Sequence, residues 1–167
     1  MTVTITPVLT DLVAAVRRVI DVRADWAHTA DLVTEALRTN LPGPDVLTPE
    51  QRLGQPDKPA GHVLHVEPDG TFSILGLVWR PGQLTRIHDH ITWCVVGVLA
   101  GVEHEELYDE NLNPLGARDG HPGDVSGFAP PGDIHRICNI NDETAISLHI
   151  YGTDVSRVGT SARRYYN

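Results

Sequence analysis

Two stretches near the start of the chain repeat apolar residues at helical spacing. Residues 8–20 and residues 28–39 each place leucine, valine or alanine every three or four positions, which is typical of a helix that buries one face. The segment 41–61 that follows holds five prolines and three glycines. We therefore expect two helices, then an irregular connection that contains a short helix at about 48–53.

From His62 onward the pattern changes, because short runs of β-branched and apolar residues alternate with turn sequences. The runs are HVLHV, TFSILGLVWR, ITWCVVGVL, EHEELYD, DVSGFA, IHRICNI and TAISLHIY, and the turns include EPDG, PGQ, NLNPLG and PPGD. Short strands at this spacing are typical of a sandwich or barrel. The sequence predicts one domain over 1–167, with a helical segment at 1–60 and a β-barrel at 61–167.

Length and composition are consistent with this interpretation and exclude several classes of partner. A chain of 167 residues with 41% apolar and 21% charged residues is ordinary for one soluble domain. A net charge of -9 argues against a nucleic-acid partner, because phosphate binding requires clustered Lys and Arg. We expect neither a signal peptide nor a membrane span, and two cysteines are too few for a disulfide scaffold. We expect a cytoplasmic protein without a membrane partner; the oligomeric state stays open.

Three histidines are placed so that they can bind one metal ion. His88 and His90 are separated by one residue on a predicted strand, so both side chains point to the same face. His135 lies on a later strand and can approach them from across a barrel. Neutral imidazole binds iron, copper, zinc and nickel. An isolated His-x-His is more often a solvated strand edge, so the surrounding residues decide between the two interpretations.

Those surroundings resemble the two sequence motifs of the cupins. The first motif is a glycine, His-x-His and a later glycine, and its matches are Gly82, His88, His90 and Gly101. The second has the core Pro-x-Gly, His and Asn, and its matches are Pro130, Gly132, His135 and Asn139. Its leading glycine departs by one place, with Asp124 at the expected position and Gly123 before it. The resemblance covers residues 72–151 and implies a mainly β cupin barrel, a double-stranded β-helix or jelly roll, preceded by two α-helices.

One departure from the common cupin motif limits the resemblance to a particular family. Most cupins carry a glutamate ligand shortly after the His-x-His, but Cys94 stands there in this sequence. That substitution resembles the thiol dioxygenases of the cysteine dioxygenase family. The stretch FSILGLVWRPGQLTRIHDH is also similar to the approach to the metal in that family. The resemblance implies Fe(2+) held by His88, His90 and His135.

A second signature of the same family lies near the end of the barrel. Ser147, His149 and Tyr151 match its Ser-x-His-x-Tyr triad, and alternation along a strand puts all three on one face. A hydrogen-bonded chain through them would orient the Tyr151 phenol towards the metal. The alternative is an inward face that is polar without a catalytic role. In members with cysteine at the Cys94 position, its sulfur is joined covalently to the tyrosine that Tyr151 matches; the alternative for Cys94 is a small buried apolar residue.

The sequence departs from the family at the positions that bind the substrate. The family holds the substrate carboxylate with arginine or glutamine, and the matching positions here are Gly61 and His62. His62 binds a carboxylate only if protonated, and it is equally well a surface residue. Arg164 resembles the paired arginine near the C-terminus of the 3-mercaptopropionate-type members. Arg80 and Arg86 flank the turn before the metal strand and are the other candidates.

The resemblance implies an enzyme that adds both atoms of O2 to the sulfur of a small thiol carboxylic acid, cysteine or one like 3-mercaptopropionate, to give a sulfinic acid. Its partners are then the thiol substrate and O2. A second hypothesis is another cupin metalloenzyme, an isomerase or a different dioxygenase that uses manganese, nickel or zinc. A third is a non-catalytic cupin that binds a small ligand.

Overall fold

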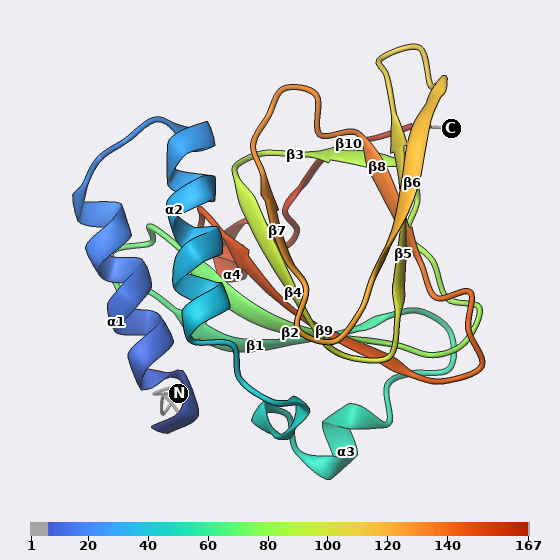
Figure 1. Cartoon of the computed structure of the whole chain (residues 1–167), viewed down its shortest axis with the longest axis horizontal. Helices are drawn as coiled ribbons and strands as arrows, with labels where there is room; N and C mark the ends of the chain where they lie inside the picture. Colours follow the sequence, from blue (N-terminus) through green and yellow to red (C-terminus); the bar gives the residue numbers. More distant parts are fainter. Residues whose placement is uncertain (1–6, 167) are drawn as a thin grey trace.

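The fold consists of two antiparallel sheets that face each other, with helices on the outer side of one sheet (Figure 1). The computed structural model describes residues 7–166. The helices are α1 (Pro7–Asp21), α2 (Trp26–Thr39), the short 3-10 helix η1 (Pro44–Val46), α3 (Pro49–Arg52) and α4 (Val155–Val158). Among the described residues, no helix is long and apolar enough to cross a membrane.

Each sheet has five strands. The strands of the first sheet, in spatial order, are β1 (Ala60–Val66), β2 (Ser73–Trp79), β9 (Ala145–Tyr151), β4 (Cys94–Ala100) and β7 (Val125–Phe128). Those of the second are β10 (Ala162–Tyr165), β3 (His88–His90), β8 (His135–Cys138), β5 (Glu103–Tyr108) and β6 (Pro114–Gly120). The predicted mainly β fold with two N-terminal helices is confirmed.

The first sheet is covered on its outer side by α1 and α2, which lie side by side (Figure 1). The apolar stripe predicted on the first helix is buried there, with Leu12 and Val16 at 0% exposure. The approach of α2 is so close that a Cβ at Gly97 on β4 would lie 3.1 Å from Cδ2 of Leu37. The central strands of the sheet, above all β9, are therefore buried on both faces, against the helices outside and the barrel interior inside.

This double burial explains the alternation in β9, all seven residues of which are buried. Residues that face the helices are apolar, and they are Ile146, Leu148 and Ile150. Residues that face the barrel interior are the candidate triad Ser147, His149 and Tyr151. One strand thus contributes both to the core and to the site.

Three elements of the fold were absent from the predicted pattern. β6 lies at a sheet edge, and six of its seven residues are exposed, so it shows no apolar alternation. The expected NLNPLG turn is shorter than predicted, since β6 begins at Pro114. β10 is also polar and lies at the edge next to β3, and α4 has only four residues, too few to show a helical repeat.

Candidate metal centre

The three histidines of the predicted site lie together between the two sheets. His88 and His90 share β3, and His135 on β8 is the direct cross-strand partner of His88. Their ring centroids form a nearly equilateral triangle with sides of 4.8, 4.8 and 4.9 Å. One ring nitrogen of each lies within 4.8 Å of those of the other two. A small side-chain movement brings three nitrogens of this kind onto a single ion.

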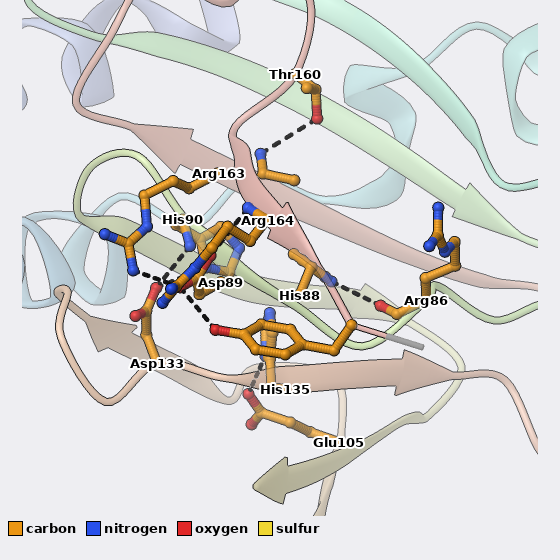
Figure 2. Close-up of polar contacts among 12 residues, drawn as sticks. Arg86, His88, Asp89, His90, Glu105, Asp133, His135, Thr160, Arg163 and Arg164 are labelled. Atoms are coloured by element: carbon orange, nitrogen blue, oxygen red, sulfur yellow. Dashed lines mark hydrogen bonds and ion pairs between the residues drawn. The ribbon is translucent and has the colours of Figure 1, made fainter. Parts of the chain in front are cut away.

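Each histidine is fixed by a hydrogen bond from its Nδ1 atom to a different acceptor (Figure 2). His88 donates to the backbone carbonyl of Arg86 at 2.8 Å, and His90 donates to Asp133 at 2.9 Å. His135 donates to Glu105 at 2.7 Å. Because these bonds occupy Nδ1, they leave the Nε2 atom of each ring for a metal and hold its orientation.

The lowered pKa values of His88 and His90 favour metal binding at neutral pH, because an unprotonated imidazole has a free lone pair. Burial and the neighbouring His135 lower the pKa of His88 to about 4, so its ring is neutral and its lone pair is available. Burial also lowers the pKa of His90. Burial alone would raise the pKa values of Asp133 and Glu105, but their bonds to His90 and His135 lower them. The carboxylates of Asp133 and Glu105 therefore stay ionised, and the rings of His88 and His90 stay neutral.

The predicted triad forms a continuous hydrogen-bonded chain. The hydroxyl of Ser147 lies 2.9 Å from Nε2 of His149, and the phenol of Tyr151 lies 3.0 Å from Nδ1 of the same ring. The shared face expected from alternation is thus confirmed, whereas the catalytic role of the three residues stays a prediction. Burial raises the pKa of Tyr151 well above its usual value, so the phenol keeps its proton.

Cys94 lies beside Tyr151, because the two residues are direct partners in the pairing of β4 with β9. Direct partners in an antiparallel pair have Cβ atoms about 4.5–5.5 Å apart. Both side chains are buried, with exposures of 1% and 7%. The covalent link between them stays a prediction, and its two partners face the same cavity.

A cavity of about 600 Å³ lies over the histidine cluster. Its lining is mostly apolar and includes Leu77, Trp79, Val96, Phe128 and Ile137. His149, Tyr151 and Cys94 also line it. Two exposed cationic residues, Lys58 and Arg86, stand at its surface. The cavity can hold a molecule with an apolar body and an anionic end.

The structure does not bring Arg164 to this cavity. Its guanidinium bonds to Asp89 at 2.8 and 3.1 Å, and Arg163 bonds to the same carboxylate at 2.7 Å (Figure 2). Asp89 lies between the two ligand histidines of β3, and these bonds tie β10 to that strand. Of the arginines considered as substrate clamps, Arg86 lines the cavity.

His62 is also directed away from the cavity. It is paired with Gly76 on β2, and a Cβ at Gly76 would lie 2.7 Å from Leu47, on the outer side of the sheet. Direct cross-strand partners share a face, so His62 lies on that outer side.

Three residues important to the site were not recognised in the sequence. Asp133 lies in the turn two residues before His135. This short separation from a predicted ligand could have identified it from the sequence. Glu105 lies on β5, two residues from Leu107, which is the direct partner of His135. The cavity residue Lys58 belongs to the irregular connection. Glu105 and Lys58 depend on strand register and loop path, which sequence spacing does not reveal.

No family model matches the chain, but solved structures do. A Klebsiella pneumoniae protein described as having a double-stranded beta-helix domain is 16% identical, with a TM-score of 0.52 over 65% of this chain and 89% of its own. An oxalate decarboxylase from Bacillus subtilis, described with Mn(II) centres, is 18% identical, with a TM-score of 0.50 over 60% of this chain and 27% of its own. An oxalate oxidase in complex with glycolate is 17% identical, with a TM-score of 0.49, and this chain covers 53% of it.

The similarities cover about two thirds of the chain or less. At these identities they concern the fold. The chain has the double-stranded β-helix fold of the cupins, and a cluster of three histidines suited to a metal ion lies between its two sheets.

Proposed function

We propose that the protein is a non-haem iron thiol dioxygenase, which converts a small thiol carboxylic acid to its sulfinic acid. The observation that carries the proposal is a donor set of three histidines beside a Cys94–Tyr151 pair. Both atoms of O2 would pass to the thiol sulfur, so the thiol and O2 alone account for the product.

Within residues 7–166, the donor set contains no carboxylate, and this supports the choice. The carboxylates near the site, Asp133 and Glu105, accept hydrogen bonds from the outer nitrogens of His90 and His135. Three neutral ligands suit an anionic thiolate better than two histidines and a carboxylate would. When bound, ferrous iron would supply positions for the thiol sulfur and O2 and would lower the pKa of the thiol.

The residues of the chain would supply a dry cavity and a held proton. Apolar side chains line most of the space over the histidines and exclude water from it. The phenol of Tyr151 stays protonated and can donate a hydrogen bond to an oxygen atom in the cavity. Lys58 and Arg86 would face the carboxylate of the substrate, because a cation offsets the cost of burying it.

The test is oxygen consumption by iron-loaded protein with a panel of thiol acids, and detection of the sulfinate by mass. The panel contains cysteine and 3-mercaptopropionate, with oxalate as a substrate that has no sulfur. The expected result is one O2 consumed per sulfinate formed, with no consumption of oxalate. Manganese-dependent turnover of oxalate, or no turnover of any thiol by the iron-loaded protein, would reject the proposal.

A further inference from the structure

Glu103 at the start of β5 is a buried carboxyl group without an assigned role. It is 4% exposed, and its Oε1 atom has no hydrogen-bond partner among the described residues. A buried carboxyl group without full pairing costs free energy. Its place beside the hydroxyl of Ser147 and the indole of Trp79 suggests what it does.

Glu103 extends the triad by one side chain. The indole N–H of Trp79 donates to Ser147 Oγ at 3.2 Å, and Ser147 and Tyr151 both bond to the ring of His149. Glu103 has Ser147 and Trp79 as its hydrogen-bonding neighbours, so it stands at one end of this chain of groups, and the phenol of Tyr151 stands at the other.

The two ends of this chain lie in different cavities. Tyr151 and His149 line the cavity over the histidine cluster, whereas Glu103 lines a second cavity of about 330 Å³. That second cavity is also lined by the exposed residues Arg38 and Asp124, so it meets the solvent. Both cavities share the wall formed by Val96, Phe128, His135 and Ile137. The chain from Glu103 to Tyr151 thus crosses from one side of this wall to the other.

The hydrogen-bonding capacities of the members allow two arrangements. The indole of Trp79 is only a donor, so it always occupies one lone pair of Ser147 Oγ. If Glu103 carries a proton and donates it to the other lone pair, the Ser147 hydroxyl donates to Nε2 of His149. Nδ1–H of His149 then donates to the Tyr151 oxygen, and the phenol O–H points into the metal cavity.

If Glu103 is ionised, every bond of the chain except the one from Trp79 reverses. The Ser147 hydroxyl donates to the carboxylate, Nε2–H of His149 donates to Ser147, and the Tyr151 hydroxyl donates to Nδ1 of His149. The phenol then offers only an oxygen lone pair to the metal cavity. One proton has left the chain, through Glu103, for the solvent of the second cavity.

We propose that Glu103 is a positioning residue whose proton sets the direction of this chain, and therefore whether Tyr151 donates a hydrogen bond into the metal cavity. The catalytic consequence rests on the proposed dioxygenase function, whereas the reversal itself does not. Burial, opposed by the bond to Ser147 and aided by nearby Glu105, raises the pKa of Glu103 to about 7. Burial lowers the pKa of His149 to about 3, so its ring stays neutral and only its tautomer changes.

Other ionisable groups surround the two ends of the chain. Around the second cavity they are Arg38, Glu105, Arg118, Asp119, Asp124 and His135. Near Tyr151 the facing group is the Cys94 thiol, whose pKa burial raises well above its usual value.

The test is nitrogen-15 NMR of histidine-labelled, metal-free protein between pH 5.5 and 8.5, because protonated and bare ring nitrogens have different shifts. We expect His149 to change from the Nδ1–H to the Nε2–H tautomer as the pH rises, with a midpoint within about one unit of the Glu103 pKa of about 7. A single tautomer of His149 at every pH in the unmodified protein would overturn the proposal.

Two variants locate the switch. Glu103→Gln should hold one tautomer at every pH, because its amide does not ionise. Ser147→Ala should do the same by breaking the link to His149. The matched control is Glu106→Gln, which changes a carboxylate on the same strand that bonds to Arg136 instead. Retention of the switch in Glu103→Gln, or its loss in Glu106→Gln, would contradict the assignment.

Activity then separates this inference from the proposed function. If Tyr151 must donate, kcat of the iron-loaded protein falls about tenfold per pH unit above the midpoint, and Glu103→Gln changes less than about twofold over that range. A tautomer switch without sulfinate formation would reject the dioxygenase and keep the role of Glu103. Sulfinate formation without the tautomer switch would support the dioxygenase and reject the role of Glu103.

Discussion

At the scale of single residues, the site depends on groups that hold the histidines as much as on the histidines themselves. Asp133 accepts hydrogen bonds from both the backbone N–H and the Nδ1 atom of His90, each at 2.9 Å. Glu105 holds His135 and is itself bonded by Arg118. Such partners fix the tautomer and direction of a ligand ring, and their loss weakens a metal site even when all ligands remain.

Asp133→Ala should therefore lower the affinity for Fe(2+) by about 10- to 100-fold without removing a ligand. The measurement is competition with a chelator of known affinity under anaerobic conditions. The matched control is Asp119→Ala, which removes the carboxylate that His104 bonds at 2.8 Å outside the cluster. Equal losses in the two variants would mean that Asp133 does not act through His90.

Substitutions of two arginines are expected to have different effects on substrate binding. Arg86→Gln should raise KM for a thiol acid by roughly 10- to 150-fold, because a charge-assisted pair with a carboxylate contributes about 1.5–3 kcal/mol. Arg164→Gln should leave KM nearly unchanged, since Arg164 bonds to Asp89 and does not line the cavity. A larger effect at Arg164 than at Arg86, in steady-state kinetics, would reverse this assignment.

At the scale of elements, the site is assembled by strands that meet from distant parts of the chain. β3 and β8 supply the histidines, β9 supplies the triad, and β10 closes the sheet next to β3. Burial would raise the pKa of Asp89, but Arg163 and Arg164 on β10 together hold it well below its usual value. This bonded carboxylate stays ionised and fastens β10 beside the cavity.

The start of β9 is fixed by close packing against Gly101. Gly101 has φ +69°, and a Cβ there would lie 2.8 Å from the Thr144 carbonyl oxygen and the Ala145 Cα atom. Gly82 has φ +82° but nothing within 4 Å of an added Cβ. Gly82→Ala should thus cost only the strain of the left-handed backbone, about 1–2 kcal/mol of unfolding free energy.

Gly101→Ala adds a collision with backbone and should cost about 2–5 kcal/mol in total. Urea unfolding of the metal-free variants measures both losses. Equal losses would show that β9 does not depend on this contact.

At the scale of the whole molecule, the spacing of apolar and polar residues was sufficient for most of the architecture. It predicted the two helices, because each buries one clear stripe, and the inward face of β9, because that strand alternates throughout. It did not predict β6 or β10, whose residues are mostly exposed and polar.

The candidate site also contains contacts that residue spacing predicts and contacts that it does not. Local spacing brings His88 and His90 to one face, but the bond between Glu105 and His135 depends on the register of β5 with β8. Likewise Arg164 matched a family pattern near the C-terminus, while its actual partner, Asp89, follows from the pairing of β10 with β3. Long-range pairing decides these contacts, and a single sequence does not specify it by spacing.

The central claim is that His88, His90 and His135 together bind one metal ion. Anaerobic titration of metal-free protein with Fe(2+), followed by removal of free ion and metal quantification, tests it most directly. The account predicts one iron per chain in the unmodified protein and none retained by the His135→Ala variant, because two imidazoles compete poorly with water and buffer. Full iron content in the His135→Ala variant, or none in the unmodified protein, would contradict it.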